Sequence, residues 1–208
     1  MSVESTIIQI AKNAKAASIE IAKVSAAKKN QALYNIAEAI EREALFIKKE
    51  NNKDLLMAKK KNLTGAMIDR LTISDATIKS MTDGLREIAA LDDPVGAISD
   101  TLLRPNGLEV SRMRIPLGVI GIIYESRPTV TVDAAGLCLK AGNAVILRGG
   151  SESLNSNKAL ADLIGKALLK TGLPETIIQI IPVRDRAAVN FLFKQRAYRA
   201  VCPFIFSY

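Results

Sequence analysis

The 208-residue sequence contains no histidine and no tryptophan, and only two cysteines, Cys138 and Cys202. The absence of histidine excludes a Ser-His-Asp triad and any other acid or base chemistry that depends on histidine. Two widely spaced cysteines provide neither a disulfide framework nor the clustered ligands of a metal site, so we expect no metal. This cysteine usage favours a reducing compartment, and we expect a cytoplasmic protein.

Long apolar runs are also lacking. No run approaches the roughly 20 apolar residues that a helix needs to cross a bilayer. The first residues, MSVESTIIQIAKNAK, do not combine a charged start with an apolar block and a small-residue cleavage site, so they do not read as a secretory signal. A content of 49% hydrophobic and 24% charged residues is typical of a globular chain, and we expect no membrane partner.

The net charge of +8 raises the question of nucleic-acid binding. Residues 104–208 carry most of the excess, whereas residues 1–103 are nearly balanced. Aromatic residues make up 4% of the chain, too few to form a stacking platform for single strands. Arginine matches carboxylate and phosphate oxygens, so an anionic small molecule is the better partner and nucleic acid is not expected. The arginines of the central block are Arg104, Arg112, Arg114, Arg127 and Arg148.

The first hundred residues are predicted to be helical. Apolar residues at three- and four-residue steps predict one helix over residues 4–27 and a second over residues 33–47. We expect the second helix to continue, with or without a break, through residues 55–57. Ser74 is a suitable N-cap for a third long helix, and a loop is expected over residues 91–99.

From residue 101 the pattern changes to alternating strands and helices. Asn106-Gly107 between two short extended segments predicts a hairpin. This alternation implies right-handed crossovers and an open, mostly parallel sheet. The expected fold class is therefore α/β, with N-terminal helices followed by a partial Rossmann-like sheet. The expected strands cover residues 117–124, 144–147 and 177–183, and the expected helices cover residues 131–140, 156–171 and a segment capped by Asp185.

A glycine-rich turn, Arg148-Gly149-Gly150-Ser151-Glu152, follows the second of these strands and leads into a helix. Glycines without Cβ atoms let a phosphate or ribose approach the backbone, and a helix N-terminus attracts phosphate. Arg148 is suited to pair with a phosphate, and Glu152 to accept a hydrogen bond from a ribose hydroxyl. The alternative is an ordinary turn in which the glycines only allow unusual φ angles, because the motif is neither a Walker loop nor a full G-x-G-x-x-G.

The central block, RPNGLEVSRMRIPLGVIGIIYESRPTVTVDAAGLCLKAGNAVILRGGSE, resembles the gamma-glutamyl phosphate reductase branch of the aldehyde dehydrogenase superfamily. Within it, PLGVIGIIYESRP and NAVILRGGSE look like the two strand-and-turn elements that build the cofactor site of that superfamily. YESRP stands where the superfamily usually has an aromatic-Asn-Phe-Pro segment. The resemblance extends from the N-terminal helices to about Phe193, and it implies a sheet of the aldehyde dehydrogenase type.

The resemblance implies a site as well as a fold. NADPH is the implied cofactor, and Ser126 takes the place of the asparagine that helps to stabilise an oxyanion in other members of the superfamily. Arg127 is expected to hold a carboxylate or phosphate of the substrate; the alternative is that it pairs with Glu125 or Asp133. The resemblance implies that Arg148, Ser151 and Glu152 face the adenine ribose and its 2′-phosphate. The residues implied to bind the cofactor are Arg148, Gly149, Gly150, Ser151 and Glu152.

The implied reaction is the NADPH-dependent reduction of L-glutamyl 5-phosphate to L-glutamate 5-semialdehyde, a step of proline biosynthesis. A cysteine thiolate attacks the acyl phosphate, and the resulting thioester is reduced. Cys138 lies on the apolar side of a predicted helix and is expected to be a core residue. The family's catalytic cysteine belongs to a later segment, so we expect a truncated chain with no catalytic residue of its own.

Three segments are expected: helices over residues 1–100, a partial dinucleotide-binding domain with a leading hairpin over residues 101–193, and an atypical tail over residues 194–208. Full-length relatives are expected to be homo-oligomers. The alternative function is a non-catalytic nucleotide-binding or interaction protein derived from the same scaffold.

Overall fold

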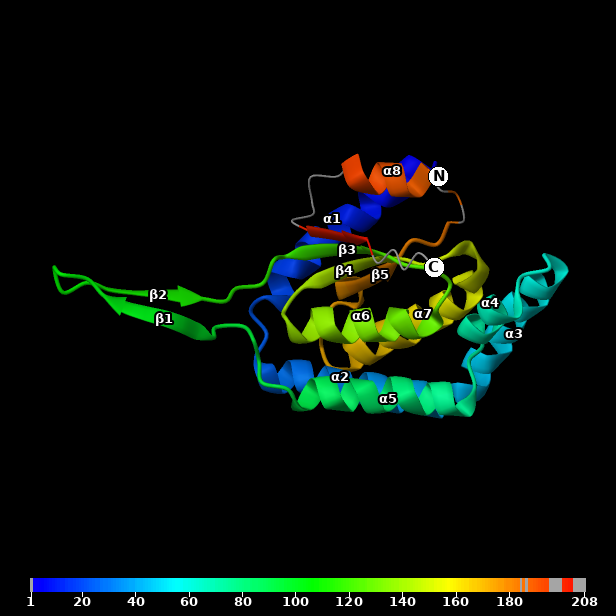
Figure 1. The fold of residues 1–208 in the computed structure, drawn as a ribbon, viewed down its shortest axis with the longest axis horizontal. Helices are drawn as coiled ribbons and strands as arrows, with labels where there is room; N and C mark the ends of the chain where they lie inside the picture. Colours follow the sequence, from blue (N-terminus) through cyan, green and yellow to red (C-terminus); the bar gives the residue numbers. More distant parts are fainter. Residues whose placement is uncertain (1, 184, 186, 195–199, 204–208) are drawn as a thin grey trace.

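The structure is a computed structural model that describes residues 2–183, 185, 187–194 and 200–203. Five helices come first, followed by a two-stranded hairpin and then by strands that alternate with helices (Figure 1). The helices are α1 (Val3–Ile21), α2 (Ala26–Arg42), α3 (Ala44–Lys60), α4 (Gly65–Leu71), α5 (Asp75–Ala90), α6 (Pro128–Lys140), α7 (Leu154–Lys170) and α8 (Ala187–Lys194). The strands are β1 (Ile98–Leu103), β2 (Glu109–Met113), β3 (Val119–Ile123), β4 (Ala144–Arg148), β5 (Ile178–Ile180) and β6 (Ala200–Pro203). Two 3-10 turns, η1 (Ser151–Ser153) and η2 (Glu175–Ile177), precede α7 and β5.

Serine caps decide where the N-terminal helices begin. Ser25 accepts a hydrogen bond from the backbone of Lys28 and starts α2, so the single helix predicted over residues 4–27 is wrong at its C-terminal end, because α1 stops at Ile21. Ser74 caps α5 as predicted and forms a reciprocal capping box with Thr77. The predicted second helix is divided at Glu43 into α2 and α3, and α4 was not predicted.

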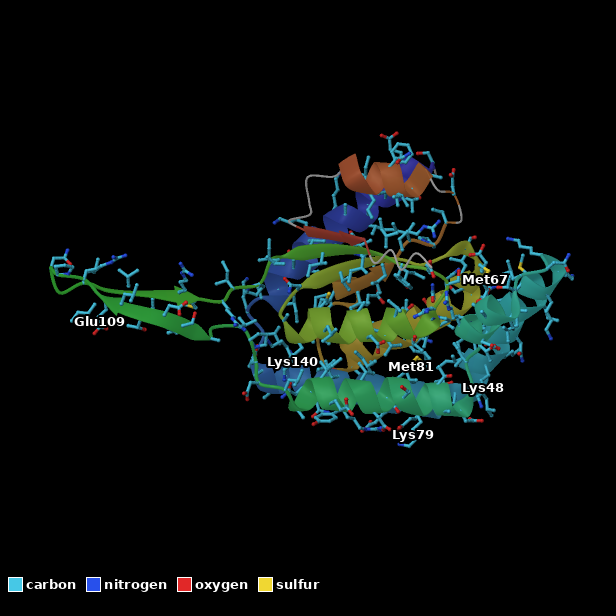
Figure 2. All side chains as sticks on the ribbon, viewed as in Figure 1. Lys48, Met67, Lys79, Met81, Glu109 and Lys140 are labelled. Carbon is cyan, nitrogen blue, oxygen red and sulfur yellow. The ribbon has the colours of Figure 1, made fainter. Side chains whose placement is uncertain are left out.

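The predicted hairpin around Asn106-Gly107 is confirmed. Strands β1 and β2 are antiparallel, and Gly107 has a positive φ of 83°, a conformation that glycine adopts without steric cost. Every residue of both strands is exposed, and the hairpin extends away from the rest of the molecule (Figure 1). In Figure 2, the labelled side chain of Glu109 lies on this hairpin, away from the other labelled side chains.

The second sheet is parallel and has the strand order β5-β4-β3-β6. Ile123 at the end of β3 is paired with Arg148 at the end of β4, so the two strands finish at the same edge. Strand β5 is shorter than the predicted range of residues 177–183, because residue 177 belongs to a 3-10 turn and residues 181–183 lie beyond the end of the strand. The predicted α/β class with a partial Rossmann-like sheet is confirmed.

The sheet lies between two helical layers (Figure 1). Helix α1 packs against β3, β4 and β5 on one face, whereas α6 and α7 cover the other face. Helices α2 and α5 form a further layer against α6 and α7. The side chains between the layers are fully buried, for example Leu33, Met81, Leu139, Ile146 and Ile164. Among the described helices, none is long and apolar enough to span a membrane.

Two buried lysines connect the outer helical layer to α6. Lys29 is 1% exposed and donates hydrogen bonds to Asp93 and to the carbonyl oxygen of Lys140, the latter at 3.0 Å. The ammonium group of Lys140 donates in turn to Asn30 at 2.7 Å and to the carbonyl oxygen of Ala89 at 2.9 Å. Both cations are therefore satisfied by groups from distant parts of the chain, as buried charges must be.

Candidate functional site

The loops that follow β3 and β4 meet at the carboxyl edge of the parallel sheet. In open α/β sheets this edge is where ligands bind. The hydroxyl of Ser126, on the β3–α6 loop, donates a hydrogen bond of 2.8 Å to Glu152, on the β4–α7 loop. Two segments that the sequence singled out separately are therefore in direct contact.

Gly150 makes this contact possible and Gly149 gives room to Asn157, for a reason that the sequence did not indicate. Neither glycine, both in the described part of the chain, has a positive φ angle. A Cβ atom on Gly150 would lie 2.0 Å from the Ser126 hydroxyl, and one on Gly149 would lie 2.3 Å from the amide nitrogen of Asn157. The glycines are therefore required because other side chains of the protein pack against the turn, and not because of unusual φ angles.

The N-terminus of α7 is occupied by a carboxylate of the chain itself. Asp54 on α3 is 1% exposed and accepts hydrogen bonds from the backbone of Asn155 at 3.2 Å and of Ser156 at 2.8 Å. It also accepts from the side chains of both residues. Asp54 therefore satisfies two of the backbone amides that a helix N-terminus leaves free and complements the helix dipole, while a ligand phosphate at this terminus stays a prediction.

Glu152 is the carboxylate that faces the loops. Its two oxygens accept hydrogen bonds from Ser151 at 2.6 Å and from Ser126 at 2.8 Å, and the ammonium group of Lys61 lies 4.0 Å away. Partial burial opposes ionisation, but the serine hydrogen bonds and the nearby lysine outweigh it and hold the pKa of Glu152 below its ordinary value. The group is therefore an ionised hydrogen-bond acceptor at neutral pH.

Arg148 lies deeper than Glu152. It is 8% exposed, and its guanidinium donates to the carbonyl oxygen of Gly149. It is not among the residues that line the cavity described next, and neither is Ser151. The role predicted for Arg148 at a 2′-phosphate stays a prediction, and it would require the side chain to turn outward.

A cavity of about 500 Å³ opens between α4 and the two loops. Sequence reasoning missed its far wall, because α4 was not predicted. A guanidinium nitrogen of Arg70 on this wall lies 3.7 Å from a carboxylate oxygen of Glu125 on the β3–α6 loop. The lining residues are Thr64, Ala66, Met67 and Arg70 on one side, and Glu125, Ser126, Arg127, Gly150 and Glu152 on the other.

Cys138 lies elsewhere. It is 6% exposed and belongs to the hydrophobic core, which confirms its prediction as a core residue. It borders a mostly apolar cavity of about 210 Å³ with Ile122, Val130 and Leu137. Among the described residues, no group of three or more cysteine or acidic side chains is placed to hold a metal ion.

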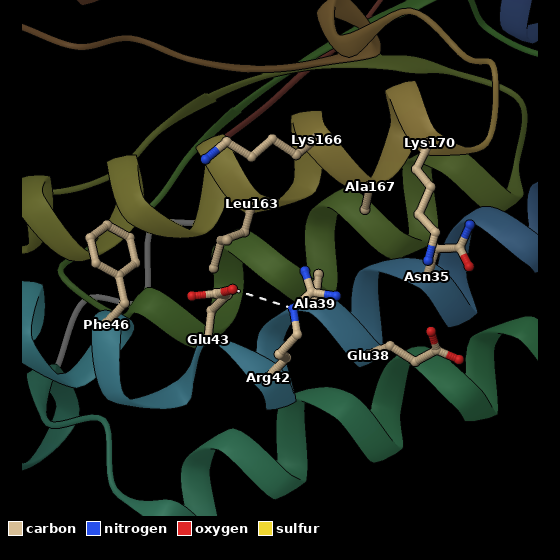
Figure 3. Close-up of a pocket in the computed structure, with 10 residues that line it drawn as sticks. All are labelled: Asn35, Glu38, Ala39, Arg42, Glu43, Phe46, Leu163, Lys166, Ala167 and Lys170. Atoms are coloured by element: carbon tan, nitrogen blue, oxygen red, sulfur yellow. Dashed lines mark hydrogen bonds and ion pairs between the residues drawn. The ribbon is translucent and has the colours of Figure 1, made fainter.

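A third cavity, of about 260 Å³, lies between α2 and α7 (Figure 3). Its wall alternates in charge, with Glu38, Arg42, Lys166 and Lys170 around it, and Arg42 is paired with Glu43 at 3.3 Å. It contains none of the residues that the sequence singled out for a site. We therefore place the candidate site at the carboxyl edge of the sheet.

Comparison with known proteins agrees with this fold. The model of the aldehyde dehydrogenase family matches residues 2–202, and the chain belongs to that family. The gamma-glutamyl phosphate reductases of Desulfatibacillum aliphaticivorans and Geotalea daltonii are 58% and 52% identical to it over 198 residues. These residues are 95% of this chain and 47% of each relative, so the chain spans about half the length of the curated relatives it matches.

Solved structures show the same relationship. The crystal structure of gamma-glutamyl phosphate reductase from Thermotoga maritima has a TM-score of 0.91 and 37% identity, with 95% of this chain and 48% of that chain covered. A probable aldehyde dehydrogenase from Listeria monocytogenes, 16% identical with a TM-score of 0.73, shares the fold over 97% of this chain and 42% of its own. The resemblance inferred from the central block is confirmed, whereas the roles of individual site residues stay predictions.

Proposed function

We propose that this chain is the cofactor-binding portion of an NADPH-dependent reductase that converts L-glutamyl 5-phosphate to L-glutamate 5-semialdehyde in proline biosynthesis. The names of the most similar relatives support the reaction. The observation that carries the proposal is the contact between Ser126 and Glu152, which joins two loops at the carboxyl edge of adjacent parallel strands and beside a cavity of about 500 Å³.

The residues of the β4–α7 turn fit a nucleotide at Glu152. Each carboxylate oxygen accepts one serine hydrogen bond and retains capacity for another, which suits the hydroxyl groups of a ribose. NADPH would supply the hydride. Lys61 is 54% exposed beside Glu152 and is placed to pair with a 2′-phosphate without the rearrangement that Arg148 needs. Sequence reasoning missed Lys61, because it lies in a lysine run that reads as a solvated helix end.

On the substrate side, we propose that Arg127 and Ser126 face the acyl phosphate. The Ser126 hydroxyl donates its hydrogen bond to Glu152, so its oxygen is left as an acceptor and its first effect is to position Glu152. The thiol that displaces phosphate from the acyl group is not Cys138, which is buried in the core. We propose that it is supplied by a part of the reductase outside the described residues.

Assembly into homo-oligomers and a cytoplasmic location stay predictions. The hairpin supports assembly, because large apolar side chains such as Leu103 and Ile115 are about 70% exposed on or beside it. The burial of Cys138 also favours a second candidate, a non-catalytic nucleotide-binding protein with the same cofactor site.

Nucleotide binding to the purified chain tests the cofactor site. We expect NADPH to bind more tightly than NADH in a calorimetric titration. Glu152→Gln should weaken both nucleotides, and Lys61→Met should remove about tenfold of the preference for NADPH. Lys60→Met, a change of an exposed lysine on the same helix, is the matched control and should leave the preference intact. Equal binding of the two nucleotides would contradict the proposed cofactor.

Addition of L-glutamyl 5-phosphate and NADPH to the same chain separates the two candidate functions. Consumption of NADPH only when the remaining half of a related reductase is added favours the reductase. Binding without consumption in that mixture favours the non-catalytic protein. Turnover by the 208-residue chain alone would overturn the claim that the thiol comes from elsewhere.

A further inference from the structure

The ion pair between Arg70 and Glu125 crosses the cavity at the candidate site. Arg70 lies on α4 and Glu125 lies on the β3–α6 loop, so the two groups come from opposite walls. Their side chains are 35% and 48% exposed, and the closest nitrogen and oxygen are 3.7 Å apart. This separation is longer than a hydrogen bond, so the two charges attract each other as an ion pair.

We propose that Arg70 and Glu125 together bind the α-amino-acid end of the substrate, with the guanidinium on the α-carboxylate and the carboxylate on the α-ammonium group. The proposal rests on the proposed function for the class of substrate. An amino acid presents one negative and one positive group on the same carbon. An arginine and a carboxylate that face a cavity offer the complementary charges at a similar spacing. Arg70 can exchange the carboxylate of Glu125 for the α-carboxylate of the ligand, and Glu125 can exchange the guanidinium of Arg70 for the α-ammonium group.

The neighbours of the pair support this orientation. Glu125 is followed by Ser126 and Arg127, which line the same cavity and are proposed to face the acyl phosphate. A ligand held at its α-carbon by Glu125 and Arg70 would therefore extend its side chain along the loop toward these two residues. Arginine suits the carboxylate because its planar fork donates two parallel hydrogen bonds.

The pair would then determine specificity. Acyl phosphates of simple dicarboxylic acids lack the ammonium group and would leave Glu125 without a ligand partner. A site that is built to bind a polar group rejects the analogue that lacks it, because its own polar group is then left uncompensated. The predicted consequence is a preference for substrates that keep both α-substituents.

Three small probes test each half of the pair on the purified chain. L-Glutamate carries both α-substituents, glutarate lacks the amino group, and 4-aminobutyrate lacks the α-carboxylate. We expect chemical-shift titrations by NMR to show L-glutamate binding about tenfold more tightly than either analogue. Glu125→Gln should abolish the preference over glutarate, and Arg70→Met should abolish the preference over 4-aminobutyrate.

Arg42→Met and Glu43→Gln are matched controls, because they change an exposed ion pair of 3.3 Å that lies in a different cavity. Both should leave the preferences intact, and thermal melting should show that all four variants fold. The proposal is overturned if L-glutamate fails to bind better than the analogues, or if the variants at positions 70 and 125 keep the wild-type preferences. Failure to bind NADPH would instead count against the proposed function and leave this result standing.

Discussion

Two ion pairs of this molecule join distant parts of the chain, and their environments are opposite. Lys29 and Asp93 approach to 2.6 Å with side chains 1% and 19% exposed. Arg70 and Glu125 remain 3.7 Å apart and are 35% and 48% exposed. The first pair joins α2 to the segment after α5 and its lysine is fully enclosed, whereas the second pair lines a cavity. The comparison indicates that the same kind of ion pair has different uses in different environments. The buried Lys29–Asp93 pair stabilises the fold, whereas the exposed Arg70–Glu125 pair is accessible to the ligand proposed above.

The buried pair is part of a network that includes Lys140. Burial lowers the pKa of Lys140, and Figure 2 shows this side chain between α6 and the outer helices. Burial opposes ionisation of Asp93, but hydrogen bonds from Lys29 and from the backbone of Val95 outweigh it and hold the pKa of Asp93 below its ordinary value. Asp93 is therefore ionised at neutral pH, and the network links α2, α6 and the segment after α5.

Replacement of Lys29 by methionine should produce the largest effect, a loss of about 3 kcal/mol in the free energy of unfolding. The change leaves the Asp93 carboxylate and the carbonyl oxygen of Lys140 without their buried donor. Arg70→Met is the matched change in the cavity and should cost no more than about 0.5 kcal/mol. Urea titrations of the three proteins measure both values. Similar losses in the two variants would remove the distinction between the pairs.

Local sequence patterns predicted the elements whose signals lie within a few residues. The Ser74 cap, the Asn106-Gly107 hairpin and the apolar runs of β3 and β4 belong to this group. Helix α4 was missed because it has seven residues and begins at a glycine, so it offers no extended periodicity. The buried position of Lys29 was not predictable either, because its partner Asp93 is brought to it only by the packing of α5 against α2.

At the candidate site, too, the sequence predicted local features but not contacts between distant residues. The sequence located the β3–α6 and β4–α7 loops correctly, because glycines and polar residues after apolar runs mark strand ends. It could not show that Gly150 makes room for Ser126, or that Asp54 fills the N-terminus of α7, since both contacts join residues far apart in the chain. The location of a site at a strand end is a local property, whereas the partners of each side chain depend on the complete fold.

Gly150→Ala should cause a loss of stability smaller than that of Lys29→Met. It tests whether close packing between the two loops of the candidate site contributes to stability, as the buried ion pair does. The added methyl group would lie 2.0 Å from the Ser126 hydroxyl and 3.0 Å from its backbone nitrogen, so the loops must separate. We expect a loss of about 1–3 kcal/mol in stability, as for other overpacked positions, together with weaker NADPH binding.

Gly84→Ala is the control for that change. Gly84 lies within α5, and nothing is within 4 Å of the position that a Cβ atom would take. Alanine there should stabilise the protein by about 0.5–1 kcal/mol, because it favours the helix. Thermal or urea unfolding in which Gly150→Ala was no less stable than the wild type would contradict the assigned role of Gly150.

A small effect, which should depend on pH, is expected for Glu152→Gln. The pKa of Glu152 is lower in the folded protein than its ordinary value of 4.5, so the folded state favours the ionised form. The resulting stabilisation is fully present above pH 4.5 and is lost as the pH falls through the folded pKa. Because the side chain is partly exposed, we expect the wild type to exceed the variant by less than about 1 kcal/mol at pH 7, with the two converging in acid. Urea titrations across this pH range measure the difference. A difference in stability that did not change with pH would show that the glutamine disturbs packing at the loops. The charge of Glu152 would then contribute as little to stability as the exposed Arg70–Glu125 pair.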